Sequence, residues 1–255
     1  MMSLYRYALQ NLPRPLLIRA SYVFRLFAPL LYRGNDVECP VCKRHFSKFL
    51  SYGSNQALRQ NVLCPHCLSL ERHRLLWIYL NQKTNFFSKQ HDVLHIAPEQ
   101  CFHERFKKLK NITYFTGDLE SPLAEYHFDL HQIPFDDNKF DVILCNHVLE
   151  HVEDYARCMR ELYRVLKPGG WAIMQVPIDY NRELTYEDKT ITSPEEREKH
   201  FWQKDHLRLF GKDYPQHLEK AGFKVKSDTF VKNLKPELRQ KFRLQNEEII
   251  YLAQK

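Results

Sequence analysis

From residue 91 onward, short apolar runs alternate with stretches whose apolar residues recur every three or four positions. Runs of the first kind are typical of buried strands, and the second spacing is typical of helices that pack on one face. The pattern therefore predicts a mostly parallel sheet with crossover helices. Strands are expected at residues 92–97, 112–117, 126–129, 140–145, 171–177, 223–230 and 248–252, and helices at 101–109, 154–166 and 212–221.

The helix expected at 154–166 carries the clearest periodicity. Its apolar face is formed at i, i+3, i+4 and i+7 by Met159, Leu162, Tyr163 and Leu166. Lys167-Pro-Gly-Gly170 follows, and glycine commonly ends a helix. We therefore expect the chain to turn there into the next buried strand.

A second apolar stretch, residues 16–32, is interrupted by Arg19, Arg25 and Pro29. A membrane-spanning helix needs about 20 apolar residues with few or no charges, so a spanning segment is not predicted. No short apolar core with a small-residue cleavage site is present, which also disfavours a secretion signal. The alternatives for the basic, amphipathic segment 1–36 are a helix pair docked on the main body and peripheral contact of residues 1–33 with a membrane surface.

The charge is unevenly distributed along the chain. The formal net charge is +7, but residues 1–90 hold 13 Lys and Arg against three acids, and the remainder is slightly acidic. A basic third favours an anionic partner such as a membrane surface or RNA, although a solvated basic face would give the same composition. We expect a cytoplasmic protein, which would be peripheral at the inner membrane surface if its anionic partner is a membrane.

Four of the seven cysteines form two Cys-Pro-x-Cys pairs separated by 21 residues: Cys39, Cys42, Cys64 and Cys67. Two tight turns that each present a thiolate pair complete a closed tetrahedral zinc site, which is structural and takes no part in chemistry. Disulfides or a redox pair are the alternatives, and the absence of a secretion signal disfavours them. Residues 37–82 are therefore expected to form a small zinc-ribbon-like module whose connecting helix is capped by Ser69. Cys101, Cys145 and Cys158 are scattered and are expected to be ordinary buried thiols.

Two segments carry a family resemblance. Phe140-Asp-Val-Ile-Leu-Cys-Asn-His-Val-Leu-Glu-His-Val-Glu-Asp154, followed by Glu161-Leu-Tyr-Arg-Val-Leu-Lys-Pro-Gly-Gly170, resembles class I S-adenosylmethionine (SAM)-dependent methyltransferases. The branch with ubiquinone and menaquinone biosynthetic enzymes is the most similar, and Ile133–Asp141 is similar to its segment before the fourth strand. The resemblance implies a Rossmann-like seven-stranded domain over 90–255, with SAM as cofactor.

The resemblance also implies which residues bind SAM. Asp118 aligns with the acid that binds the two ribose hydroxyls, with Leu119 beside it, and it follows His95 by 23 residues, as a nucleotide-binding βαβ unit requires. Asp129 aligns with the acid that hydrogen-bonds the adenine amine, and Leu130 is expected to pack on the ring. Asn146 lies where cofactor meets substrate. Each acid could instead be a cap or turn residue.

The first loop departs from the family pattern. It reads His95-Ile-Ala-Pro-Glu-Gln-Cys101, with Ala97, Glu99 and Cys101 where glycines usually let the backbone approach the cofactor. Either SAM binds through a reshaped loop, with Glu99 facing the positive charge of the cofactor, or binding has been lost. We favour the reshaped loop, because Asp118 and Asp129 remain.

Residues 178–211 form a long insertion where a lid over the carboxyl end of the sheet is expected. Substrate contacts are predicted at Tyr180, Asp205 and Arg208. Histidine titrates near neutral pH, so the candidates for a general base are His147, His151 and His206. A helix-end or turn role is the alternative for each histidine.

Three functions remain open from the sequence. The favoured one is a methyltransferase for a small-molecule or glycoconjugate acceptor. The others are an RNA methyltransferase with a zinc module and a non-catalytic protein that kept the fold. Fold alone does not separate them.

Overall fold

The computed structural model describes residues 14–53 and 58–255, so residues 1–13 of the predicted N-terminal segment lie outside it. The chain divides into two compact units. The cysteine unit comprises the described part of residues 1–85 with 99–105 and 230–248, and the sheet unit comprises 86–98, 106–229 and 249–255. The sequence predicts one continuous domain over 90–255, whereas the structure assigns two of its segments to the cysteine unit.

The described part of the cysteine unit consists of short strands, four α-helices and one 3₁₀ helix. Two antiparallel hairpins, β1–β2 and β3–β4, flank the cysteine pairs. The elements are α2 (Arg14–Leu31), β1 (Val37–Cys39), β2 (Arg44–Phe46), β3 (Leu50–Tyr52), β4 (Arg59–Leu63), α3 (Glu71–Lys83), α4 (Gln100–Phe106), a 3₁₀ helix (Phe230–Asn233) and α8 (Pro236–Lys241). The last residue of α4, Phe106, belongs to the sheet unit.

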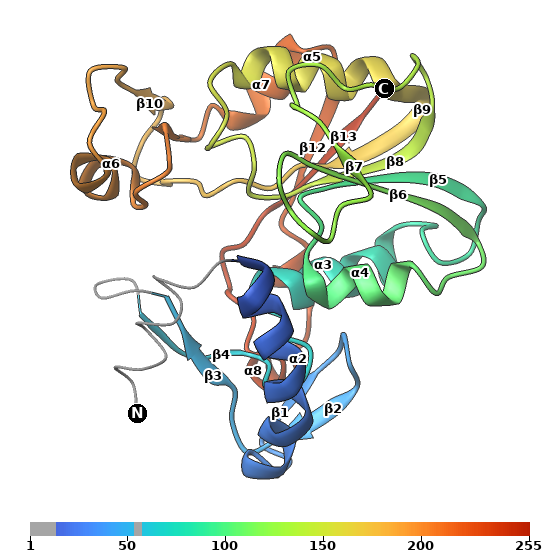
Figure 1. Ribbon diagram of the computed structural model, residues 1–255, viewed down its shortest axis with the longest axis vertical. Helices are drawn as coiled ribbons and strands as arrows, with labels where there is room; N and C mark the ends of the chain where they lie inside the picture. Colours follow the sequence, from blue (N-terminus) through green and yellow to red (C-terminus); the bar gives the residue numbers. More distant parts are fainter. Residues whose placement is uncertain (1–13, 54–57) are drawn as a thin grey trace. The chain divides into compact units, whose positions relative to one another are not determined.

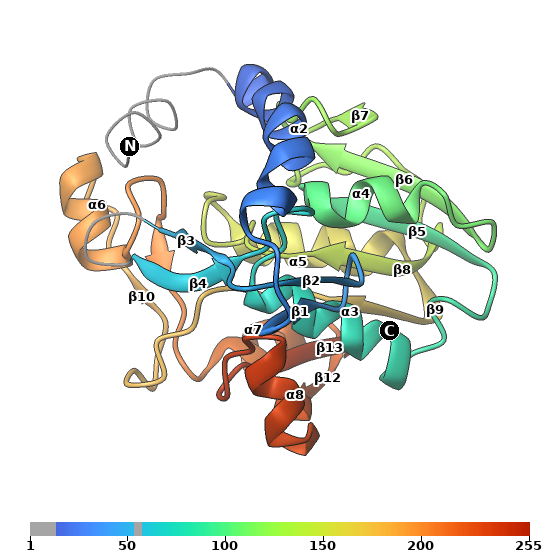
Figure 2. The same ribbon diagram turned by 90° about the horizontal axis from the view of Figure 1, so that it is seen from below.

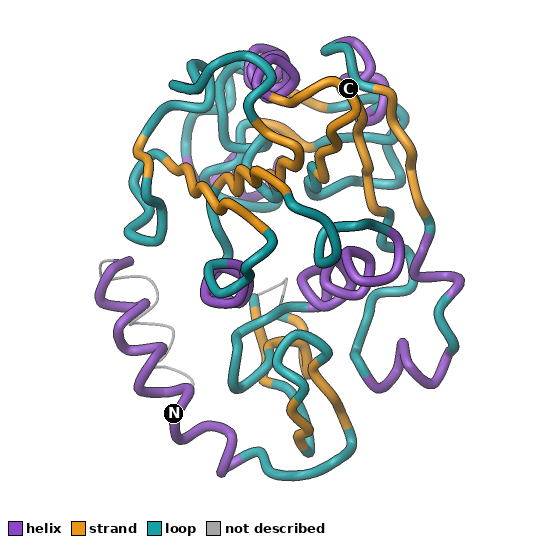
Figure 3. Tube along the Cα trace, turned by 90° about the vertical axis from the view of Figure 1, so that its right-hand side faces the viewer, coloured by secondary structure: helices purple, strands orange, loops and turns teal. Residues whose placement is uncertain are grey.

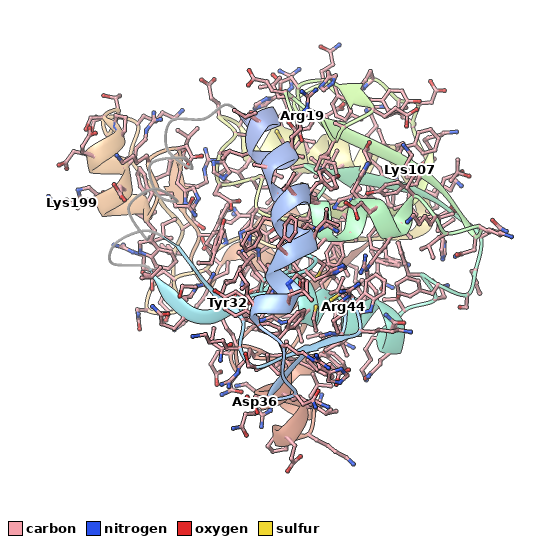
Figure 4. The ribbon with its side chains drawn as sticks, turned by 60° about the horizontal axis from the view of Figure 1, so that its bottom comes forward. Arg19, Tyr32, Asp36, Arg44, Lys107 and Lys199 are labelled. Atoms are coloured by element: carbon pink, nitrogen blue, oxygen red, sulfur yellow. The ribbon has the colours of Figure 1, made fainter. Side chains whose placement is uncertain are left out.

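Buried arginines hold the cysteine unit together. Arg74, with no exposed surface, donates hydrogen bonds to the carbonyls of Val62, Ser69 and Phe242 at 2.6–2.8 Å. Arg25 of α2 forms a bidentate ion pair with Glu104 at 2.7 and 3.0 Å, and its Nε donates to the carbonyl of His66. Arg25 is therefore engaged within the fold, while Arg19 on α2 and Arg44 on β2 are exposed (Figure 4).

The sheet unit contains the predicted seven-stranded sheet, in the order β12-β13-β9-β8-β5-β6-β7. β5 to β9 are parallel, and β13 is antiparallel to both of its neighbours. Figure 2 shows the central strands side by side, and the strands are drawn orange in Figure 3. The strands are β5 (His91–Ile96), β6 (Ile112–Asp118), β7 (Tyr126–His127), β8 (Phe140–Cys145), β9 (Leu166–Ile173), β12 (Lys224–Asp228) and β13 (Ile250–Gln254).

Helices α5 (Tyr155–Val165) and α7 (Tyr214–Lys220) cover one face of this sheet (Figure 1). α5 begins where Asp154 accepts a hydrogen bond from the Arg157 amide, and its apolar face is buried in the main core, as its periodicity predicts. The next strand begins at Leu166, earlier than predicted. The pairing of β8 with β9 jumps from Phe140–Leu166 to Val142–Trp171, because residues 167–170 bulge out of the ladder.

The insertion 178–211 has structure of its own. A two-stranded ladder pairs β10 (Tyr186–Glu187) with β11 (Arg208–Leu209), and α6 (Pro194–Phe201) lies between them in the chain. α6 begins at the Ser193 cap and has Pro194 in its first turn, which suits a helix start. The insertion projects away from α5 and α7 (Figure 1).

Within residues 14–53 and 58–255, no helix is long and apolar enough to span a bilayer.

Candidate functional site

The four predicted metal ligands converge in the cysteine unit. The sulfur atoms of Cys39, Cys42, Cys64 and Cys67 all lie within 4.8 Å of one another, with Sγ–Sγ distances of 3.5 Å for Cys39–Cys67 and 3.7 Å for Cys42–Cys64. These distances exceed the 2.05 Å or so of a disulfide. They fit the spacing of about 3.8 Å that four sulfurs at about 2.3 Å from one tetrahedral ion would have.

The two cysteine turns have the same local geometry. The amide of Lys43 donates to the carbonyl of Cys39 at 2.7 Å, and the amide of Leu68 donates to that of Cys64 at 3.0 Å. Lys43 and Leu68 both have positive φ, 57° and 61°, so each turn closes the same way directly after its second cysteine. The two turns thereby place both thiol pairs around a common point.

Ser69 has a role other than the predicted one. Leu70 is the N-cap residue of α3, and its amide donates a hydrogen bond to Nδ1 of His73 at 3.1 Å. The Ser69 hydroxyl instead lies 3.2 Å from the sulfurs of both Cys39 and Cys67. Cys39, Cys64 and Cys67 are buried and Cys42 is half-buried, and burial raises the pKa of the Cys64 thiol, so thiolates here would need a cation among them. The cluster can therefore hold a metal ion as a closed, structural site.

In the sheet unit, the strand order reverses between β5 and β8, since the chain passes outward to β6 and β7 before it returns. In open α/β sheets, ligands bind at the carboxyl ends of the strands at such a point. Ala97, Asp118 and Asn146 directly follow or end β5, β6 and β8, respectively. We call these strand ends and the loops that follow them the crevice edge.

Ala97 at this edge adopts a backbone conformation suited to glycine. Its φ is 49°, and its amide donates to the carbonyl of Gly117 at 2.8 Å, which ties the end of β5 to that of β6. A left-handed conformation costs a residue with a Cβ about 1–2 kcal/mol. The loop therefore keeps the conformation that a glycine would favour, although its sequence has lost the glycine.

Asp118 is held firmly at the end of β6. Its Oδ1 accepts hydrogen bonds from the amides of Glu120 and Ser121 at 2.8 and 2.7 Å. Leu119 exposes 66% of its surface, whereas Leu130 is buried in the main core. Of the two leucines predicted to bind the cofactor, Leu119 is therefore available for a ligand, whereas Leu130, predicted to pack on the adenine ring, lies in the core.

Asp129 is engaged with His131. Its Oδ1 accepts from the amide of His131 at 2.9 Å and lies 2.6 Å from the ring Nδ1. The backbone hydrogen bond is the main cause that lowers the pKa of Asp129. Nε2 of His131 in turn accepts from the amide of Asp154, at the start of α5.

The remaining predicted cofactor residues lie in different surroundings. His95 is buried in β5, with its Nδ1 2.7 Å from the Tyr114 hydroxyl. Asn146 is also buried. Glu99 belongs to the cysteine unit, where its Oε1 lies 4.0 Å from Nε2 of His73.

All three predicted histidines lie close to Glu150, a residue that no sequence motif indicated. His147 Nδ1 lies 3.4 Å and His151 Nε2 4.0 Å from Glu150 Oε1, and the rings of His151 and His206 are 4.7 Å apart. Burial opposes the charge on Glu150, but the nearby rings of His147 and His151 outweigh it and lower the pKa of Glu150. Burial is the main cause that lowers the pKa of His206.

The residues predicted to contact substrate differ in their exposure. Tyr180 is exposed, and Asp205 lies 3.3 Å from Nδ1 of His151. Burial opposes protonation of His151, but Asp205 and Glu150 outweigh it and raise its pKa.

Arg208, also predicted to contact substrate, has no exposed surface. It donates hydrogen bonds to the carbonyls of Leu149, Val152 and Glu153 at 2.6–2.9 Å and pairs with Glu187 at 3.1 Å. Its guanidinium therefore fixes the loop after β8 and does not face a ligand.

Comparison with known proteins gives one family match: the methyltransferase domain model matches residues 90–174. A demethylmenaquinone methyltransferase of Staphylococcus epidermidis is 45% identical over 58 residues, which are 23% of this chain and 24% of that protein. The enzyme of the same name from Listeria monocytogenes is 48% identical over 69 residues, 27% and 29% of the two chains. The chain spans about a quarter of the length of these curated relatives.

Solved structures are similar at low identity. A SAM-dependent methyltransferase from Mesorhizobium loti is 13% identical with a TM-score of 0.43 and covers 68% of this chain and 97% of that one. The [4+2]-cyclase SpnF is 14% identical with a TM-score of 0.47 and covers 92% and 93%. Residues 90–174 thus match the methyltransferase domain model, and the observed sheet order agrees with the resemblance of the sequence segments.

Proposed function

We propose that this protein is a SAM-dependent methyltransferase that acts on a small-molecule or glycoconjugate acceptor. The single observation that carries the proposal is the carboxylate of Asp118 at the end of β6, next to the left-handed turn at Ala97, within the segment that matches the methyltransferase family. Demethylmenaquinone methyltransferases, the relatives named above, favour a small-molecule acceptor.

In this proposal the crevice edge binds the cofactor. Asp118 accepts hydrogen bonds from the ribose hydroxyls, and the exposed side chain of Leu119 packs on the adenine ring. The turn at Ala97 brings backbone groups close to the methionine part, as a glycine turn would. Asp129 is the candidate partner of the adenine amine, and it would have to share its carboxylate with His131.

Methyl transfer needs little covalent chemistry from the protein. The acceptor displaces the sulfur in line, and the sulfur leaves as a neutral thioether with the electron pair of the broken bond. The protein aligns the two reactants and excludes water, so proximity supplies much of the rate gain. A general base is needed only if the nucleophile carries a proton, and His147 or His151 would then be within the same loop.

For the four-cysteine cluster we propose a bound Zn²⁺. The support is the all-thiol donor set, its burial and sulfur distances that suit a tetrahedral ion. Four protein ligands leave no open position, so the ion would stabilise the cysteine unit and would not take part in methyl transfer.

We also propose that α2 makes peripheral contact with a membrane surface. Its last turns expose large apolar side chains, with Leu30 75% and Leu31 79% exposed, and the exposed Arg33 follows two residues after its end. Apolar residues next to basic ones suit an interface with anionic lipid. Flotation with vesicles of anionic and of neutral lipid measures this contact, and equal recovery without lipid would contradict it.

The enzymatic proposal is tested by the ligand that the purified protein retains and by the transfer it performs. Mass spectrometry of the denatured protein should detect SAM or S-adenosylhomocysteine. Incubation with methyl-labelled SAM and quinol, phenol or glycan acceptors should move the label to one class. If the label instead enters RNA, in a reaction that weakens steeply with salt, the small-molecule proposal is wrong.

A further inference from the structure

Three side chains outside the four-cysteine cluster also meet as metal ligands do. Glu150 and His151 lie in the loop after β8, and His206 comes from the insertion 178–211. One donor atom from each lies within 4.8 Å of the others. A carboxylate oxygen and two imidazole nitrogens are therefore grouped at one point of the sheet unit.

The carboxylate of Glu150 is the first indication that an ion belongs there. Glu150 is 1% exposed, and neither of its oxygens has a hydrogen-bond partner within the described part of the chain. A buried ionised carboxylate is costly unless it is paired or coordinates a metal. The His147 ring at 3.4 Å is the neighbour that could pair with it instead of an ion.

The two histidines present lone pairs toward the carboxylate. Nδ1 of His206 lies 2.8 Å from the carbonyl of Phe201, so Nδ1 carries the proton, and no partner is found among the described residues for the buried Nε2. Nδ1 of His151 faces the carbonyl and carboxylate of Asp205, both at 3.3 Å. Metal-binding histidines are oriented in this way, by a carbonyl or carboxylate on the other ring nitrogen.

We propose that Glu150, His151 and His206 bind a divalent transition-metal ion. Imidazole ligands suit manganese, iron, cobalt or zinc better than calcium, which prefers oxygen alone. Donor atoms about 2.1 Å from one ion lie about 3–4 Å apart, and His151 Nε2 is 4.0 Å from Glu150 Oε1. Three protein ligands leave coordination positions open, unlike the closed set of four cysteines.

The open positions indicate the class of acceptor, an inference that rests on the proposed methyltransferase function. The cluster begins five residues after Cys145 ends β8, at the edge where cofactor and acceptor would meet. A divalent ion binds hydroxyl oxygens and lowers their pKa. The acceptor is then a compound with a hydroxyl group, whose oxygen bonds to the methyl carbon while the carbon–sulfur bond breaks and the hydroxyl proton passes to water.

Mn²⁺ is added to the full chain with one zinc ion retained per chain, and the loss of the free Mn²⁺ signal in electron paramagnetic resonance measures binding at the site. Mn²⁺ prefers oxygen and nitrogen ligands, so thiolates compete poorly for it. One ion should bind per chain. Loss of a group that only orients a metal ligand costs about 10–100-fold in affinity for the metal. Glu150 is proposed as a direct ligand, so Glu150→Gln should weaken Mn²⁺ binding by at least about 100-fold.

Matched variants keep the test decisive. His151 is half-buried, and His151→Gln replaces Glu150→Gln if the latter does not fold. His200→Gln is the control, because His200 forms a separate pair with Glu196 at 3.4 Å on α6. Absence of Mn²⁺ binding to the wild type, or equal binding by wild type and Glu150→Gln or His151→Gln, would overturn the metal site and favour a His147–Glu150 ion pair.

Calorimetry with SAM on the same samples separates this inference from the proposed function. SAM binding without Mn²⁺ binding would overturn the metal site alone. Mn²⁺ binding by a folded chain that does not bind SAM would support the metal site and overturn the methyltransferase proposal together with the acceptor class.

Discussion

The four-cysteine cluster and the crevice edge of the sheet differ in how far their chemistry depends on the rest of the fold. Each cysteine pair is contained in one tight turn, and both turns have the same hydrogen bond and the same positive φ. At the crevice edge, by contrast, Glu150 and His206 are 56 positions apart in the chain and meet only through the fold. A site made of local turns can be predicted from spacing, and a site made of distant segments cannot.

The largest effect is expected at the cysteine cluster. Cys39→Ser removes one ligand of a closed set, and structural zinc contributes its binding energy to folding. We expect the zinc content to fall below one ion per chain and the cysteine unit to lose more than about 4 kcal/mol of stability. Zinc analysis and chemical denaturation measure both.

The matched control is Cys101→Ala, at a buried thiol of the same unit outside the cluster. It should leave the zinc content unchanged and cost about 1–2 kcal/mol. If Cys39→Ser behaved like this control, the four cysteines would not form a metal site.

A smaller loss of stability is expected at Arg208, which holds the loop after β8 at the crevice edge. Arg208→Met leaves Glu187 and three loop carbonyls without their buried donor, which should cost about 3–5 kcal/mol. Thermal unfolding gives the stability change, and methyl transfer should fall with it because residues 149–153 lose their anchor. Arg182→Met, at an exposed ion pair with Asp179, should cost less than about 1 kcal/mol. Equal costs for the two variants would contradict a positioning role for Arg208.

The smallest effect is expected at the turn after β5. Ala97→Gly relieves a left-handed conformation worth about 1–2 kcal/mol, and the greater flexibility of glycine in the unfolded chain offsets part of this. The variant should be more stable by up to about 1 kcal/mol and should bind SAM at least as tightly. A destabilised Ala97→Gly would show that the loop does not retain a glycine-like turn.

The strands and the zinc ligands were predictable because their signals are local. The apolar runs at 92–97, 112–117 and 140–145 match β5, β6 and β8 within one residue at each end, since buried strands of a parallel sheet are continuously apolar. The cysteine pairs were likewise predictable from their spacing.

Other features depend on tertiary contacts that no local pattern records. α8 was missed because Pro236–Lys241 has no buried residue and hence no apolar periodicity. Residues 230–248 read as part of the sheet domain, yet the carbonyl of Phe242 bonds to the buried Arg74 of the cysteine unit. Glu150 stands in no motif of its own, and only the fold shows that it is buried between histidines.

The central claim, that the crevice edge binds SAM, is tested most directly by calorimetric titration of the zinc-replete wild type and of Asp118→Asn with SAM. The wild type should bind one SAM per chain with a dissociation constant in the micromolar range. Asp118→Asn, which loses a charged acceptor for the ribose hydroxyls, should bind about 10–100-fold more weakly. A folded wild type that gives no binding heat at several temperatures, or an Asp118→Asn variant that binds as tightly as the wild type, would contradict the account.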